Sequence, residues 1–173
     1  MINDQMTSTT SELSEATRVL ARAGIESARS DAEWLFAHVL DVDRGRLAFV
    51  DEPDATARAR YRDLVARRAR RIPLQHIIGR AAFGPVDVAV GPGVFVPRPE
   101  TEVMLEWSVE SLRSVTDPLV ADLCSGSGAL AIAIAVSVPS ARVVAVEKSP
   151  AALLWLRRNV ENLGVGDRVA VLG

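Results

Sequence analysis

Asp122-Leu-Cys-Ser-Gly-Ser-Gly128 is the stretch that decides the fold of the C-terminal part of this chain. It closes the apolar run Leu119–Leu123, which predicts a strand, and leads into Ala129–Val138, which predicts a buried helix. Gly126 and Gly128 allow a sharp bend and a close approach of the backbone to a ligand, and the helix start presents unpaired N–H groups. A strand, a glycine-rich turn and a helix in this order indicate a nucleotide-binding turn.

Glu147 supports this interpretation from the end of the second predicted strand, residues 142–147. It follows the glycines by roughly twenty residues, the spacing at which a carboxylate can accept hydrogen bonds from both ribose hydroxyls of a nucleoside. A helix over 150–163 and a third strand over 168–172 continue the alternation. Both faces of these strands are apolar, which predicts a parallel sheet covered by helices on both faces.

Asp122 distinguishes between the possible nucleotides. The spacing Gly126-x-Gly128-x-x-Ala131 also fits a dinucleotide turn with alanine in third place. A dinucleotide such as NAD brings a pyrophosphate to the turn, and an acidic side chain beside it would repel that anion. S-adenosylmethionine has no phosphate, but its ammonium and sulfonium are attracted by a carboxylate. The sequence therefore favours S-adenosylmethionine as the cofactor.

The rest of the chain divides by composition. Residues 1–10 are polar without periodic apolar positions, so we expect a disordered tail. Residues 11–73 carry three stretches with helical apolar spacing and predict a helical bundle. Residues 74–97 alternate apolar and polar positions between Gly-Pro pairs and predict a β-hairpin linker, before a partial cofactor-binding domain over 98–173. The predicted fold class is α/β, with an N-terminal helical bundle, a linking hairpin and the first half of a Rossmann-like sheet.

Composition excludes several classes of protein. The chain of 173 residues is 49% hydrophobic and 24% charged, which is the balance of a globular protein. Its formal net charge of −2 gives no overall attraction to nucleic acid, so we expect no direct nucleic-acid binding. No apolar run reaches the roughly 20 residues of a membrane span, and the N-terminus lacks the features of a secretion signal. We therefore expect a cytoplasmic protein without a membrane anchor.

Three segments together resemble the HemK/PrmC family. They are Pro73-Leu-Gln-His-Ile-Ile-Gly79, Val96-Pro-Arg-Pro-Glu-Thr-Glu102 and the glycine-rich stretch 122–133. Members of that family are class I methyltransferases that modify the side-chain amide of a glutamine in the Gly-Gly-Gln loop of peptide-chain release factors. The resemblance extends from about Ser11 to the end of the chain. It implies S-adenosylmethionine-dependent methylation, release factors as partners, and a substrate-docking role for the helical domain.

The resemblance also assigns roles to single residues. It implies that the loop of Cys124, Ser125, Gly126, Ser127 and Gly128 surrounds the methionine part of the cofactor. Glu147 would bind the ribose, and Asp122 would be an acidic support nearby. Family members usually have glycine where this chain has Cys124. We interpret that cysteine as a small buried side chain rather than a redox or nucleophilic group.

The segment Pro97–Glu102 resembles the family's stretch beside the active site. This makes Arg98, Glu100 and Thr101 candidates close to the substrate. Helix initiation is an alternative explanation for Glu100 and Thr101, because acidic and capping residues stabilise a helix start. For Arg98 the alternative is a structural ion pair with a nearby glutamate.

The catalytic signature of the family, Asn-Pro-Pro-Tyr, does not occur in this sequence. No residue is therefore predicted to be catalytic, and we expect the 173-residue chain, as an N-terminal portion of a longer protein, to be inactive by itself. Two other functions remain open: methylation of nucleic-acid amino groups, for which a similar motif serves, and a non-catalytic cofactor- or partner-binding module. An incomplete parallel sheet also leaves its first strand as an apolar edge, which we expect to promote self-association.

Three weaker signals have mainly structural interpretations. The third predicted helix, about Ala55 to Arg71, is rich in arginine, which we interpret as a solvated face rather than a surface for a release factor or RNA. His38 and His76 lack a second ligand at metal spacing, so no metal site is predicted. Trp107 lies on an apolar helix face and is expected in the core.

Overall fold

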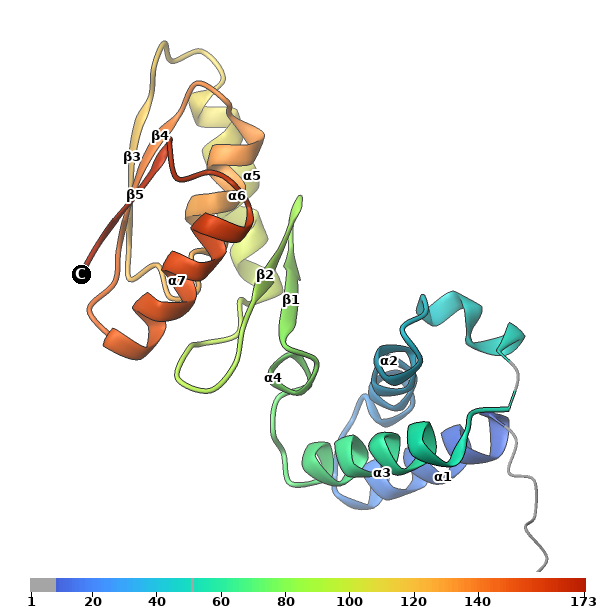
Figure 1. The fold of residues 1–173 in the computed structure, drawn as a ribbon. Coiled ribbons are helices and arrows are strands. Elements are labelled where there is room, and N and C mark those ends of the chain that lie inside the picture. Colours follow the sequence, from blue (N-terminus) through green and yellow to red (C-terminus); the bar gives the residue numbers. More distant parts are fainter. Residues whose placement is uncertain (1–8, 51) are drawn as a thin grey trace, which may run out of the picture. The chain divides into compact units, whose positions relative to one another are not determined.

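A computed structural model describes residues 9–50 and 52–173, and its contacts divide them into two compact units that meet between Ile78 and Gly79. Each unit is described separately (Figure 1). The N-terminal unit is helical, and all the strands that the structure describes belong to the C-terminal unit. The predicted α/β fold class is confirmed, including a sheet with only three parallel strands.

The N-terminal unit is a bundle of helices around one apolar core. Its elements are α1 (Thr9–Arg22), α2 (Ala28–Leu40), the 3-10 helix η1 (Arg44–Phe49), α3 (Ala55–Ala69) and α4 (Leu74–Ile78). Tyr61 of α3 is buried and stacks on Phe36 of α2 with 4.3 Å between ring centroids. The Tyr61 hydroxyl donates to the Ala32 carbonyl at 3.1 Å, which joins α3 to α2.

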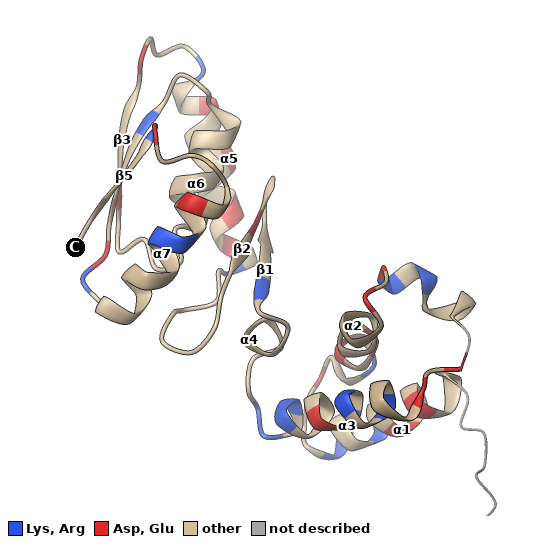
Figure 2. Ribbon diagram, in the orientation of Figure 1, with Lys and Arg blue, Asp and Glu red and all other residues tan. Residues whose placement is uncertain are grey.

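The arginines of α3 are largely used within this unit. Arg62 donates to the carboxylate of Glu12, and Arg68 to that of Asp31, at 2.5 and 2.6 Å. Both acids are buried, so each depends on its arginine for a charged partner. Figure 2 shows basic residues along α3 and acidic residues on α1 and α2. The arginines of α3 were interpreted as a solvated face, and the structure shows that two of them instead pair with buried acids of this unit.

The structure differs from the predicted boundaries at both ends of this unit. Most of the expected tail, residues 1–8, lies outside the described residues, while Thr9 and Thr10 already belong to α1. The segment predicted as part of a hairpin linker from residue 74 begins with a helix, α4. Pro73 accepts the first hydrogen bond of this helix from Ile77, and Gly79 follows it with a φ of 82°. Proline before and glycine after a short segment are the usual signals of a helix.

The C-terminal unit begins with the predicted hairpin and continues as alternating helices and strands. Its elements are β1 (Arg80–Phe83), β2 (Val86–Ala89), the 3-10 helix η2 (Pro99–Thr101), α5 (Glu102–Leu112), β3 (Leu119–Leu123), α6 (Ala129–Ser137), β4 (Arg142–Val146), α7 (Pro150–Asn162) and β5 (Val169–Leu172). β1 and β2 pair antiparallel, with Phe83 opposite Val86. β3, β4 and β5 form a separate parallel sheet in that order.

Among the described residues, helices cover one face of the parallel sheet, whereas helices on both faces were predicted. Right-handed crossovers between strands that are added in one direction place every connecting helix on the same side. In Figure 1, α5, α6 and α7 accordingly lie on one side of β3, β4 and β5. Leu119 and Leu123 of β3 point away from these helices, and each is 70% exposed. Apolar residues on both faces therefore do not establish that both faces are covered within the described residues.

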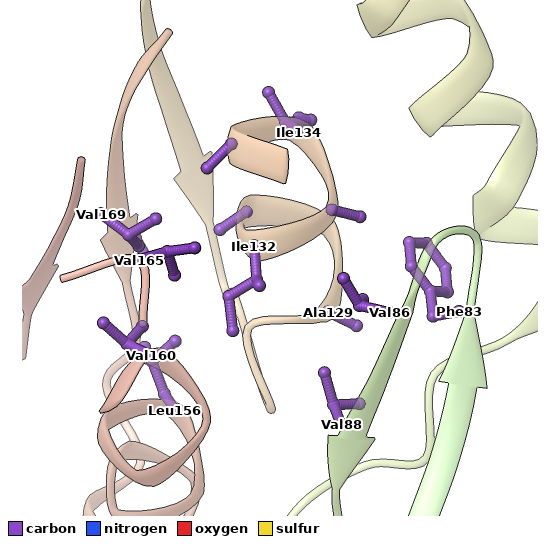
Figure 3. Packing of buried hydrophobic residues seen from close by; sticks show 14 of the residues in the cluster. Phe83, Val86, Val88, Ala129, Ile132, Ile134, Leu156, Val160, Val165 and Val169 are labelled. Atoms are coloured by element: carbon purple, nitrogen blue, oxygen red, sulfur yellow. The ribbon is translucent and has the colours of Figure 1, made fainter. Parts of the chain in front are cut away.

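The core of this unit lies between the sheet, the helices and the hairpin. Figure 3 shows Ile132 of α6 among these side chains, with Leu156 of α7 and Val88 of β2 nearby. The central helix α6 is apolar from Ala129 to Val136, and six of its nine residues are buried: Ala129, Ala131, Ile132, Ala133, Ile134 and Ala135. α6 is thus buried over most of its length, which fixes the glycine-rich loop at its N-terminus.

α5 packs less completely than its sequence predicts. Leu105 is its only buried residue, and Trp107 is 71% exposed rather than in the core. Within residues 9–50 and 52–173, no helix combines the length and hydrophobicity that a bilayer crossing requires.

Candidate cofactor site

The glycine-rich loop between β3 and α6 is held by hydrogen bonds to the neighbouring strand. Ser125 donates from its backbone N–H to the Val146 carbonyl at 3.0 Å, and its hydroxyl donates to the Asp122 carbonyl at 2.9 Å. Gly128 closes the turn by donating its N–H to the Ser125 carbonyl at 2.7 Å. The loop is therefore a defined turn at the carboxyl ends of β3 and β4, where parallel sheets bind ligands.

Cys124 adopts a backbone conformation that favours glycine. Its φ is 65°, in the left-handed region, where the Cβ of an L-residue approaches the following carbonyl at a cost of about 1–2 kcal/mol. The side chain is exposed at the loop surface, which corrects its interpretation as a buried residue. This position of the turn therefore favours glycine, and Cys124 occupies it with its side chain exposed.

The two glycines of the loop have different roles. An added Cβ on Gly126 would have no heavy atom within 4 Å, so this position faces open space where a ligand can approach. An added Cβ on Gly128 would lie 2.3 Å from Cδ1 of Leu156. Gly128 therefore allows α6 to pack closely on α7, while Gly126 leaves room above the loop. Both have positive φ angles, 56° and 82°.

Glu147 anchors the loop through its carboxylate. One oxygen accepts the Gly126 N–H at 2.8 Å, and the other accepts the Ser149 N–H at 2.7 Å. Because a carboxylate oxygen has two lone pairs, each oxygen can accept one more hydrogen bond from a ligand hydroxyl. The side chain is consequently oriented in advance at the end of β4.

Asp122 has a side-chain oxygen at this site without a hydrogen-bond partner among the described residues. This oxygen, Oδ2, is buried. Burial raises the pKa of Asp122 above its ordinary value, and the negative charge of Glu147 acts in the same direction. The Ser125 hydroxyl and the Ala131 backbone N–H act in the opposite direction. A cationic ligand beside this carboxylate would stabilise its charged form and offset the effects of burial and of the Glu147 charge.

A cavity of about 280 Å³ lies between the loop and the segment before α5. One wall is the loop from Asp122 to Ser127. The other includes Phe95, Arg98 and Thr101, and the Arg98 guanidinium stands over the Phe95 ring with 5.1 Å to its centroid. Met104 of α5 completes this side. The cavity is thus lined by the Asp122 carboxylate on one wall and by an arginine and an aromatic ring on the other.

Comparison with known proteins supports the resemblance seen in the sequence. The family model described as PrmC N-terminal domain matches residues 12–79, and the one described as conserved hypothetical protein 95 matches residues 92–173. A release factor glutamine methyltransferase from Mycolicibacterium smegmatis is 55% identical over 160 residues, 92% of this chain and 57% of that protein. The chain belongs to the HemK/PrmC family.

Other relatives of this HemK/PrmC chain agree. A release factor glutamine methyltransferase from Streptomyces coelicolor is 52% identical over 160 residues, 91% of this chain and 55% of its own length. The chain spans slightly more than half the length of these curated relatives. Among solved structures, the precorrin-6y C5,15-methyltransferase from Geobacter metallireducens matches 49% of the chain and 43% of that protein, with 21% identity and a TM-score of 0.39.

The structure of the HemK/PrmC chain brings most of the predicted site residues together. Asp122, Cys124, Ser125, Gly126 and Ser127 line the cavity from one side, and Arg98 and Thr101 line it from the other. Three predicted residues stand outside the cavity lining. Glu147 contacts the loop by a hydrogen bond, Gly128 packs against Leu156, and Glu100 is exposed in η2.

Two residues near this site of the HemK/PrmC chain were missed in the sequence. Phe95 lines the cavity and is 69% exposed, although its apolar character alone predicts packing. Asn159 of α7 is buried and donates to the Ser127 carbonyl at 2.8 Å. Its signal in the sequence is a polar residue on the apolar face formed by Leu156 and Val160. Sequence reasoning treats such an asparagine as solvated, and only the fold shows its partners.

Proposed function

We propose that this chain takes part in the S-adenosylmethionine-dependent methylation of the glutamine side-chain amide in the Gly-Gly-Gln loop of peptide-chain release factors. One observation carries the proposal. The similarity to proteins named release factor glutamine methyltransferase extends through both the N-terminal and the C-terminal unit. Partners of the protein would be release factors, and the cytoplasm would be its compartment. The helical unit, residues 11–73 in the predicted division, would dock the substrate.

The chemistry of the loop supports S-adenosylmethionine rather than NAD. The buried oxygen of Asp122 without a hydrogen-bond partner, with Glu147 adding negative charge, favours a ligand with a positive group. S-adenosylmethionine carries an ammonium and a sulfonium, whereas NAD carries a pyrophosphate that these carboxylates would repel. The open space above Gly126 allows a ligand to approach the backbone. The residues present therefore fit the methyl donor.

The chain's own residues would each hold a part of this cofactor. Glu147, fixed by its two N–H donors, would accept the ribose hydroxyls with its remaining lone pairs. Asp122 would stabilise the ammonium end, and the loop from Cys124 to Gly128 would surround the methionine part. Arg98, on the facing wall, would contact the carboxylate of the cofactor or the substrate.

The reaction needs a well-oriented substrate. When bound, S-adenosylmethionine supplies an electrophilic methyl group on its sulfonium. A glutamine amide nitrogen is a weak nucleophile because its lone pair is delocalised into the carbonyl, so rate depends on positioning. The exposed Phe95 and Thr101 lie on the same wall of the cavity and would limit where a substrate side chain can enter.

The proposal is tested with the product of the complete gene and labelled S-adenosylmethionine. We expect label on an intact release factor and none on a release factor whose Gly-Gly-Gln glutamine is replaced by alanine. Label on nucleic acid but not on the release factor would overturn the proposal in favour of nucleic-acid methylation. Calorimetry of the chain with S-adenosylmethionine and with NAD tests the cofactor separately, and preferential binding of NAD would contradict its assignment.

We also propose that the isolated chain self-associates through its sheet. β3 is an edge of the parallel sheet among the described strands, and its outward residues Leu119 and Leu123 are largely exposed. Unpaired strand edges with apolar side chains favour pairing with another copy. Analytical ultracentrifugation at increasing concentration is expected to show dimers or larger species, and a monomer at high concentration would contradict this expectation.

A further inference from the structure

Asn159 of α7 is buried at the junction of three segments of the C-terminal unit. It is 1% exposed, and its side chain makes three hydrogen bonds. Oδ1 accepts the Ala89 N–H at 2.8 Å, while Nδ2 donates to the Ala89 carbonyl at 3.0 Å and to the Ser127 carbonyl at 2.8 Å. One carboxamide therefore connects α7 with the end of β2 and with the glycine-rich loop.

The three partners determine which side chain fits. Two of them are carbonyl oxygens and one is an N–H, so the side chain must offer two donor hydrogens and one acceptor from a single planar group. Among short side chains only the carboxamide of asparagine does so. Aspartate would direct a carboxylate oxygen at two carbonyl oxygens, and an apolar residue would leave all three buried backbone groups without this partner.

Both segments that Asn159 holds lead directly to walls of the cavity. Ser127 lies in the loop wall between Gly126, which is bonded to Glu147, and Gly128. Ala89 ends β2, and the chain continues from there to Arg98 on the facing wall. Asn159 does not line the cavity itself. It acts on the site from the core, through the backbone of the two segments.

A second residue of α7, Trp155, holds the same stretch by a hydrogen bond of its own. The indole N–H of Trp155 donates to the Pro92 carbonyl at 3.1 Å, and its ring fills the space that a side chain at Gly91 would need. The hydrogen bond of Trp155 thus secures the chain after β2 to α7, whereas the hydrogen bonds of Asn159 reach both this chain segment and Ser127 in the loop. The pair provides a matched comparison within one helix.

We propose that Asn159 is a positioning residue that sets the spacing between the two walls of the cofactor site. The proposal rests on the proposed function, because it assigns the cavity to S-adenosylmethionine. Replacing the carboxamide leaves the groups that touch the cofactor in the sequence but releases the Ser127 carbonyl and the end of β2. The binding groups then no longer face one another in the arrangement that the ligand requires.

The test compares Asn159→Asp, Asn159→Ser and the control Trp155→Phe in the 173-residue chain. Each protein is first titrated with urea, and S-adenosylmethionine affinity is measured by calorimetry at a temperature where more than about 99% is folded. We expect both Asn159 variants to bind at least about tenfold more weakly than the parent chain, and Trp155→Phe to stay within about threefold. Equal affinity of Asn159 variants and control would overturn the proposal.

The remaining outcomes also decide the question. If the parent chain binds no S-adenosylmethionine, the assigned cofactor fails, and amide hydrogen exchange then tests the positioning role alone. Faster exchange of the Gly126 and Gly128 N–H groups in Asn159→Ser than in Trp155→Phe supports that role, and equal exchange overturns it. If neither Asn159 variant folds, Asn159 is required for the fold as a whole and the proposal is also overturned.

Discussion

The two units of this chain bury acidic groups in opposite ways. In the helical unit, the buried carboxylates of Glu12 and Asp31 each have an arginine of α3 as partner. In the sheet unit, the buried oxygen of Asp122 has no hydrogen-bond partner within the described residues, and it lies at a cavity. A partner offsets the desolvation cost of a buried charge, whereas a buried charge without a partner is maintained at the full cost. This difference places an acidic group without a partner only at the cavity of the C-terminal unit, among the three acids compared.

The ion pair of Asp31 gives the largest expected effect. Arg68→Met removes the guanidinium but keeps most of the apolar stem, so the Asp31 carboxylate remains buried without its partner. We expect the free energy of unfolding to fall by about 4 kcal/mol. Urea unfolding of the variant measures this, with Arg18→Met as the control, because Arg18 pairs with Glu15 on the surface of α1. If Arg68→Met lowers the free energy of unfolding less than Arg18→Met does, the buried Asp31 carboxylate does not depend on its arginine, and the contrast with Asp122 no longer holds.

Alanine substitutions of the two loop glycines are expected to differ in their effects on the C-terminal unit. Gly128→Ala forces a Cβ against Leu156 in a left-handed backbone, and we expect a loss of about 3 kcal/mol in stability. Gly126→Ala meets no side chain, so its stability loss is about 1 kcal/mol and its main effect is weaker cofactor binding. Thermal unfolding and calorimetry of both variants test the difference. Equal stability losses would show that both glycines are packing residues.

Asp122 tests directly whether its charge serves a ligand. Because the pKa of Asp122 is raised in the folded state, this state binds the proton more tightly than the unfolded state, and its charged form lowers stability at neutral pH. Asp122→Asn should therefore raise the free energy of unfolding by about 1 kcal/mol at pH 7.5 while weakening S-adenosylmethionine binding.

The pH dependence of this variant provides the control. As the pH falls through the folded-state pKa of Asp122, protonation stabilises the parent chain, so the advantage of Asp122→Asn should shrink. Urea unfolding of both proteins from pH 7.5 down to about pH 4, the ordinary pKa of an aspartate, measures the trend. An advantage that grows as the pH falls would contradict the direction of the pKa shift.

Cys124 gives the smallest effect. Cys124→Gly relieves a left-handed conformation worth about 1–2 kcal/mol but adds unfolded-state entropy of about 0.5–1 kcal/mol. We expect a net gain of about 0.5 kcal/mol in stability, measured by the urea midpoint at constant slope. Cys124→Ala, which keeps a Cβ in the same conformation, should show no gain. A gain in the alanine variant would attribute the effect to the thiol instead of the backbone.

Much of this arrangement could be predicted from sequence because the signals were local. The strand, turn and helix around Gly126 and the position of Glu147 follow from spacing, and the helices of the first unit follow from apolar periodicity. Three features could not be predicted in this way. The exposure of Leu119 depends on which face the crossovers cover, the conformation of Cys124 depends on the turn, and the partners of Asn159 are distant in sequence.

The order of strands in the parallel sheet has a consequence for the synthesis of the protein. β3, β4 and β5 are neighbours in the same order in which they leave the ribosome. At typical translation rates, each new strand follows its neighbour within about 1 to 5 s, and it can add to an edge that is already in place. No earlier strand has to wait for a later one to be inserted between it and its partner. The glycine-rich loop can therefore take up its turn before α7, which brings Asn159, has been made.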